Sequence, residues 1–178
     1  MKTYNSTALY LGSFDPIHQG HIKVLEHLVG VFLKVYIVPS PQNPFKPKQT
    51  PLWLRVEMIE EALKECGLED KVDIYLGNIS PEHYTYKQIG DLALKGYYIV
   101  GGTDIKEQIK TWKNADWILE NFNTYFINRP GYSEETNENL VELSSNEIRN
   151  LIKENKSINE LVPRSVEEII YKKELYKT

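Results

Sequence analysis

The segment that most constrains the fold of this 178-residue chain is Gly12-Ser13-Phe14-Asp15-Pro16-Ile17-His18-Gln19-Gly20-His21. It follows a short apolar run, 8–11, and precedes an amphipathic segment, 22–32. A buried strand, a glycine- and proline-containing turn and a helix are the expected order of such a sequence. The chain is therefore predicted to begin with a strand–turn–helix unit.

The same segment suits an anion. The free backbone N–H groups and the dipole at a helix N-terminus attract negative charge, and Gly12 would let the backbone approach a ligand closely. His18 and His21 are three residues apart, so they would share a face of a helix beginning near Pro16. Two imidazoles at this place suit a polyphosphate whose charge changes during a reaction. The alternative is a turn with two surface histidines.

Strand-like and helix-like segments alternate along the rest of the chain. Strands are expected at 7–11, 34–39, 72–76, 97–100 and 124–127. Helices are expected at 20–32, 52–65, 84–94, 117–121, 146–154 and 165–173. This alternation predicts βαβ units and a mostly parallel sheet, with ligands beyond the carboxyl ends of the strands. We therefore expect one α/β domain, 1–178, with a Rossmann-like doubly wound parallel sheet, helices on both faces and a helical C-terminal end.

Composition narrows the possible partners. The net charge of −4 argues against a general nucleic-acid surface. No apolar run approaches the roughly 20 residues of a membrane span, and the first residues lack the apolar stretch of a signal peptide. Cys66 is the only cysteine, which excludes an internal disulfide. A reduced, cytoplasmic location is expected.

Three further features are ambiguous when taken alone. The loop 39–48 carries Lys46 on a proline-rich backbone, which also suits an ordinary surface loop. Arg55, within the segment 52–65, suits a solvated helix face as well as a site. At 143–149, Ser145 would cap a helix while Ser144 and Arg149 reach an anion, or the segment is simply a capped helix with a surface arginine.

The first motif resembles the GxFDPxHxGH motif of the nucleotidylyltransferase superfamily, whose adenylyltransferases act at the α-phosphate of ATP and release pyrophosphate. The segment 143–149 resembles the I-S-S-T-x-I-R motif, which binds the β- and γ-phosphates of ATP in that superfamily. The resemblance implies binding of ATP by Gly12, Ser13, Phe14, His18, His21, Gly102, Asp104, Ser144, Ser145 and Arg149. It also implies that the catalytic residues are His18, His21, Lys46 and Arg149.

Other segments resemble the bacterial nicotinate-mononucleotide (NaMN) adenylyltransferases. Residues 98–104 resemble F-I-I-G-x-D, 128–132 resemble R-R-P-G-Y, and 39–46 resemble P-x-x-x-P-P-H-[KR], with Phe45 where the family often has His. Arg55 fits the R-x-x-M pattern. In this family the tryptophan matching Trp112 stacks on the pyridine ring, and Thr85 would hold the nicotinate group. The residues implied to bind the mononucleotide are Lys46, Arg55, Thr85, Trp112 and Arg129.

The expected partners are ATP and a pyridine mononucleotide. No His, Cys and Asp cluster has metal-ligand spacing, and Asp15, before a proline, is more simply a turn former. Mg²⁺ is expected to arrive with ATP, held by phosphates and water. The sequence does not set the oligomeric state, and a homo-oligomer is compatible with it. Alternative functions are the same chemistry on nicotinamide mononucleotide (NMN) or phosphopantetheine, or a non-catalytic nucleotide-binding module; retention of both His18 and His21 counts against the last.

Overall fold

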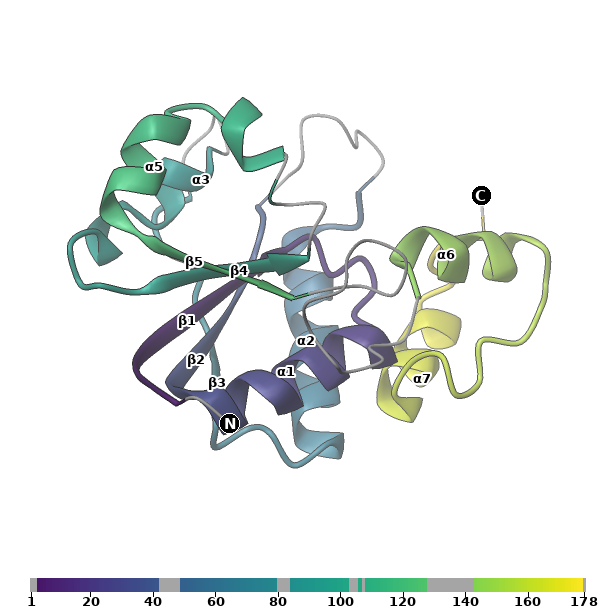
Figure 1. Ribbon diagram of the computed structural model, residues 1–178. Helices are drawn as coiled ribbons and strands as arrows, with labels where there is room; N and C mark the ends of the chain where they lie inside the picture. Colours follow the sequence, from purple (N-terminus) through teal and green to yellow (C-terminus); the bar gives the residue numbers. More distant parts are fainter. Residues whose placement is uncertain are drawn as a thin grey trace.

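The computed structural model describes residues 3–41, 49–79, 84–102, 106, 108–127 and 143–177. Its centre is a parallel five-stranded sheet of order β3-β2-β1-β4-β5 (Figure 1). The strands are β1 (Tyr4–Gly12), β2 (Phe32–Pro39), β3 (Val72–Ile74), β4 (Tyr98–Gly102) and β5 (Asn123–Ile127). The chain moves outward from β1 to β3 on one side and returns to β4 on the other. This order confirms the doubly wound sheet.

The helices lie where the sequence predicts them, with one exception. They are α1 (Gln19–Val31), α2 (Leu52–Glu65), α3 (Thr85–Gln88), α5 (Ala115–Asn121), α6 (Ser145–Lys153) and α7 (Arg164–Lys172), with 3₁₀ turns η1 (Gly90–Leu92) and η2 (Ile109–Thr111). The single helix expected over 84–94 is wrong, because α3 ends at Gln88 and η1 follows Ile89. Gly90 stands where a continuous helix would have to pass, and glycine is a poor helix former.

Helices cover both faces of the sheet. Along β1, Ala8 and Tyr10 belong to one buried cluster with residues of α1, α2, α6 and α7. Leu9 and Leu11 belong to a second cluster with residues of α5, η1 and η2. Successive side chains of a strand point to opposite faces, so this apolar strand is buried on both sides. Figure 1 shows α1 and α2 across the sheet from α3 and α5. The expected two-faced arrangement is confirmed.

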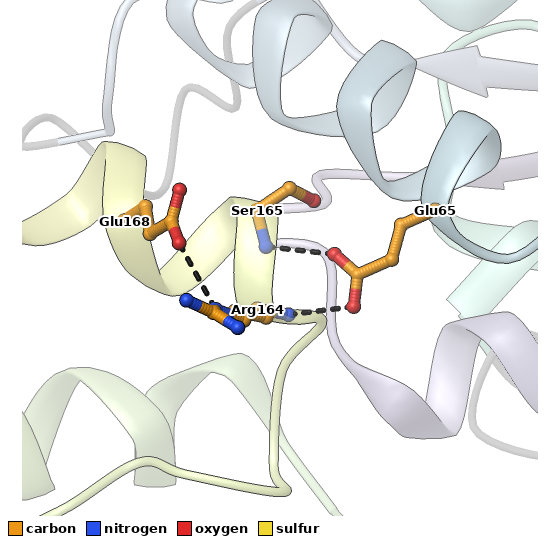
Figure 2. A network of polar contacts seen from close by, with 4 residues as sticks. All are labelled: Glu65, Arg164, Ser165 and Glu168. Atoms are coloured by element: carbon orange, nitrogen blue, oxygen red, sulfur yellow. Dashed lines mark hydrogen bonds and ion pairs between the residues drawn. The ribbon is translucent and has the colours of Figure 1, made fainter.

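The C-terminal helices are attached to the α2 side. Pro163 precedes α7 and offers no side-chain cap. Glu65, at the end of α2, takes that role, because its carboxylate accepts hydrogen bonds from the backbone N–H groups of Arg164 (2.9 Å) and Ser165 (2.7 Å) (Figure 2). Desolvation opposes ionisation of Glu65, but the bonds from Ser165 and Arg164 outweigh it and lower its pKa. A negative charge at a helix N-terminus also complements the helix dipole.

The topology directs attention to one edge of the sheet. Strand order reverses beside β1, and the carboxyl ends of parallel strands at such a point form the usual ligand crevice. Gly12 pairs with Pro39, and the backbone N–H of Ser40 donates to the carbonyl of Gly12 (2.8 Å). Gly102 ends the neighbouring strand β4.

No helix in the described part of the chain is long and apolar enough to cross a membrane.

Candidate functional site

The histidine pair lies at the start of α1. The helix begins at Gln19, one residue before the predicted bound, and His18 is its N-cap in extended conformation. His18 Nδ1 accepts a hydrogen bond from the His21 backbone N–H (3.4 Å), and His21 Nδ1 accepts one from the His18 backbone N–H (3.2 Å). The two rings stack with their centroids 3.6 Å apart. Each histidine therefore caps the backbone of the other and holds its ring in place.

This reciprocal capping decides which ring nitrogen is a donor. A neutral imidazole carries one proton, and a nitrogen that accepts a hydrogen bond is the one without it. With Nδ1 accepting in both rings, the proton of each neutral ring lies on Nε2. His18 is 2% exposed and His21 9% exposed, so the rings are set in a largely dry environment where such donors are strong. The pair can donate to an anion beside the helix N-terminus.

The N-terminus of α6 is joined to the loop before the histidines. Arg149 Nη1 donates to the carbonyl oxygen of Asp15 (2.6 Å), and Ser145 Oγ donates to that of Pro16 (2.9 Å). Ser144 is the cap, since its hydroxyl accepts from the Glu147 N–H (3.2 Å). The expectation that Ser145 caps the helix is therefore wrong. The segments 12–21 and 143–149, more than a hundred residues apart in sequence, are in direct contact.

Arg55 is buried, with 1% of its surface exposed, so the expected solvated helix face is wrong. Its guanidinium donates to four backbone carbonyl groups, those of Thr50 (2.8 Å), Ser13 (2.7 Å), Ser40 (2.8 Å) and Pro41 (2.8 Å). Burial lowers the pKa of Arg55, and the negative charge of Asp15 opposes that effect. Arg55 thus ties together the loop after β1, the loop after β2 and the approach to α2. Its contact with a mononucleotide stays a prediction.

Gly12 and Phe14 form one packing unit. The Phe14 side chain is 1% exposed and packs edge-on against Tyr10 and His21. A Cβ atom on Gly12 would lie 2.8 Å from Cζ of Phe14, closer than packing allows. Glycine at this position is therefore required by the Phe14 ring, a reason that the sequence did not reveal. Because that ring is buried, a contact of Phe14 with ATP would have to come from its backbone.

Asp15 is the residue whose importance sequence reasoning missed. It does lie in a turn, and its peptide bond to Pro16 is cis, but its side chain is 4% exposed. One carboxylate oxygen accepts from the Thr50 N–H (3.1 Å) and the other from the Tyr176 hydroxyl (2.6 Å). Both oxygens are thus engaged by protein donors. The only signal in the sequence was an acidic residue inside the strongest motif.

Gln88 was also missed. It is buried at the end of α3, where its amide nitrogen donates to the carbonyl groups of Pro39 (3.0 Å) and Leu76 (3.1 Å). These bonds connect α3 to the end of β2 and to the segment after β3. Nothing in the local pattern distinguishes this glutamine from a solvated one, because both acceptors lie elsewhere in the chain.

The residues expected at the pyridine ring lie on the α3 and α5 side of the sheet. Thr85 is the first residue of α3, and the partly buried Trp112 follows η2 and packs against the second cluster. Gly102 ends β4 between the two sides. Lys46, Asp104 and Arg129 lie outside the described residues. The described contacts place Ser145 and Arg149 against the loop that carries Ser13 and leads to His18 and His21. Thr85 and Trp112 lie on the other side of the sheet.

The donor set does not fit a resident metal ion. Among the described residues there is no group of three or more His, Cys, Asp or Glu side chains that could hold one. The buried Asp15 carboxylate binds two protein donors, and the Nδ1 atoms of His18 and His21 accept from backbone N–H groups. These atoms are already used in holding the loop, and they are not arranged as metal ligands.

Comparison with known proteins agrees with this geometry. The cytidylyltransferase-like family matches residues 9–151, a span that includes the end of β1, the histidine pair and most of α6. The chain belongs to the cytidylyltransferase-like family. Among its relatives in that family, the probable nicotinate-nucleotide adenylyltransferase of Cytophaga hutchinsonii is 33% identical, with 94% of this chain and 96% of the relative covered. The similarly named protein of Flavobacterium johnsoniae is 31% identical over 95% and 97% of the two chains.

Solved structures share the fold. A putative nicotinate-nucleotide adenylyltransferase from Vibrio parahaemolyticus matches with a TM-score of 0.72 at 21% identity, covering 98% of this chain and 96% of that one. The Plasmodium falciparum nicotinic acid mononucleotide adenylyltransferase complexed with NaAD matches with a TM-score of 0.75, also at 21% identity, covering 97% and 98%. These structures show the shared fold, and the family model and the two relatives confirm the resemblance noted in the sequence.

Proposed function

We propose that this chain transfers AMP from ATP to nicotinate mononucleotide, giving deamido-NAD and pyrophosphate. The observation that carries the proposal is the reciprocally capped histidine pair at the N-terminus of α1, in contact through its loop with Arg149 of α6. The choice of nicotinate mononucleotide as the acceptor rests on the relatives, which are named probable nicotinate-nucleotide adenylyltransferases. The same features argue for a nucleotidyltransferase rather than a passive nucleotide-binding module, which would not need two oriented donors.

In the proposed reaction, an oxygen of the NaMN 5′-phosphate attacks the α-phosphorus of ATP. A new P–O bond forms, the bond from the α-phosphorus to the oxygen bridging to the β-phosphorus breaks, and pyrophosphate leaves with that electron pair. The attacking phosphate is already ionised, so no general base is required. Catalysis then rests on positioning and on stabilising the charge that moves onto the leaving group.

The phosphate-side residues have the following proposed roles. His18 and His21 donate from Nε2 to phosphate oxygens as charge develops on them, assisted by the α1 dipole. Arg149 neutralises the β- and γ-phosphates, moving part of its hydrogen bonding from the Asp15 carbonyl to the ligand. Lys46 adds a second cation. The remaining proposed ATP contacts come from Gly12, Ser13, Phe14, Gly102, Asp104, Ser144 and Ser145.

The mononucleotide-side roles rest on the family resemblance. Trp112 would stack on the pyridine ring, and Thr85 with nearby backbone would hold the nicotinate carboxylate. Lys46 and Arg129, which lie outside the described residues, are also proposed to bind the mononucleotide. Arg55 was expected here too, and its four carbonyl bonds favour a role in holding the loops rather than a direct contact.

Mg²⁺ would come bound to the triphosphate, since both oxygens of the Asp15 carboxylate accept hydrogen bonds from Thr50 and Tyr176. We also propose that the protein works in the cytoplasm as a single domain, and a homo-oligomer is compatible with the chain. The proposed partners are ATP and a pyridine mononucleotide.

The test is pyrophosphate release on mixing the protein with ATP and NaMN, with NMN and phosphopantetheine assayed in parallel. Release with NaMN supports the proposal, and release only with another acceptor replaces it. ATP binding without release with any acceptor indicates a binding module. His21→Ala should abolish most of the release. His27→Ala is the matched control, because His27 lies on the same helix and bonds Tyr125 (2.9 Å) instead.

A further inference from the structure

We propose that Tyr176 is a positioning residue for the transfer reaction and acts through Asp15. The kinetic tests of this inference rest on the proposed function, because they measure AMP transfer from ATP to NaMN. Tyr176 follows α7 near the end of the chain, in left-handed backbone conformation (φ 64°). Its hydroxyl donates to Oδ1 of Asp15 at 2.6 Å, across 161 positions of sequence. The C-terminal segment thereby reaches the middle of the first phosphate motif.

Asp15 is the junction of three separate segments. Its side chain is held by Tyr176 and by the Thr50 N–H just before α2, and its carbonyl oxygen accepts from Arg149 of α6. Asp15 itself is three residues before His18. A shift of Asp15 must therefore be transmitted both to the capped histidine and to the arginine proposed to hold ATP.

The hydroxyl of Tyr176 is suited to this role. A carboxylate that is 4% exposed requires donors in place of water. Burial raises the pKa of Tyr176, and the neighbouring negative charge of Asp15 raises it further. The hydroxyl therefore keeps its proton and remains a donor at any working pH. Leu175 helps to place the tail, because its N–H donates to the carbonyl of Ile170 (3.0 Å).

The position of this junction predicts which kinetic constants respond. Tyr176, Asp15 and Arg149 lie on the α1 and α6 side of the sheet, with the phosphate motifs. Thr85 and Trp112 lie on the other side. Loss of the Tyr176 hydroxyl should change kcat and the KM for ATP, and leave the KM for the mononucleotide nearly unchanged.

The experiment compares Tyr176→Phe with Tyr171→Phe. Tyr171 is a 45% exposed residue of α7 and provides a matched loss of one hydroxyl. We expect Tyr176→Phe to lower kcat/KM for ATP by about tenfold or more, since small misplacement of reacting groups is costly. The KM for NaMN should stay within twofold, and Tyr171→Phe should match the wild type. Reduced thermal stability of Tyr176→Phe with unchanged kinetic constants would make Tyr176 a merely structural residue and overturn the proposal.

A double-mutant cycle with Asp15→Asn tests the route. If Tyr176 acts through the Asp15 carboxylate, the Tyr176→Phe effect on kcat/KM should nearly vanish when Asp15 is already Asn. A full effect in that background would overturn the proposed route.

Hydrogen exchange of the ligand-free protein gives a readout that needs neither substrate nor a folded Asp15→Asn variant. Amides of 12–18 should exchange faster in Tyr176→Phe while those of β2 stay unchanged, and equal exchange in 12–18 would overturn the proposal. A wild-type protein that releases no pyrophosphate would refute the proposed function alone, leaving this exchange test valid.

Discussion

Replacing His18 separates its two roles, capping α1 and donating to phosphate. His18→Ala removes both. His18→Asn removes the ring Nε2–H but keeps a short side-chain acceptor, and asparagine is among the best N-cap residues. The two variants therefore share the loss of the proposed catalytic donor and differ in the cap.

The expected magnitudes follow from the geometry. Loss of an N-cap costs about 1 kcal/mol of stability, which lowers Tm by about 2–4 °C in a chain of this size. His18→Ala should show this decrease, and His18→Asn should recover most of it. Loss of an oriented donor to developing charge costs about 2.7–4 kcal/mol, so kcat should fall about 10²–10³-fold in both variants. ATP binding should weaken much less than kcat falls.

The assay is pyrophosphate release at saturating ATP and NaMN, combined with thermal unfolding of the ligand-free protein. His27→Asn is the control, because His27 lies roughly 9 Å further along the α1 axis than His21. It should keep wild-type kcat. Near wild-type kcat in His18→Asn, with a large loss in His18→Ala, would show that His18 acts only as a cap. Near-normal turnover in both variants would refute the catalytic role altogether.

Four other outcomes are expected. Arg149→Ala should raise the KM for ATP more than the KM for NaMN. A change in the KM for NaMN alone would show that Arg149 binds the mononucleotide and not ATP. NaMN should exceed NMN in kcat/KM, because a site with donors for a carboxylate leaves the amide NH₂ unpaired; Trp112→Ala should weaken both substrates and leave their ratio nearly unchanged, as steady-state kinetics would reveal. Glu65→Gln should destabilise the protein at pH 7, and the difference in Tm should shrink as the pH falls below 4.5. The pKa of Glu65 is lowered, so its contribution is complete above the ordinary value of 4.5 and is lost as the pH falls through the lower folded value. Parallel Tm-against-pH curves for this variant and the wild type would contradict that linkage.

Much of the fold follows from local pattern alone. The order of strands and helices, the bounds of α2, and the apolar strands β1 and β2 were predictable because hydrophobic periodicity reflects which face of each element is buried. The motif at 12–21 also sufficed to predict an anion site and its two histidines. Its resemblance to a known family added the substrate and the residues expected to bind it.

The tertiary structure decided how that site is held. Arg55 has an ordinary helical spacing, yet its four carbonyl acceptors come from two loops, the one after β1 and the one between β2 and α2. Asp15 has the local pattern of a turn residue, yet its carboxylate meets Tyr176 from the far end of the chain. Ser144 rather than Ser145 caps α6, because the Ser145 hydroxyl is bonded to Pro16. Hydrogen-bond partners distant in sequence are set by the packing of whole elements, and periodicity within a single segment carries no record of them.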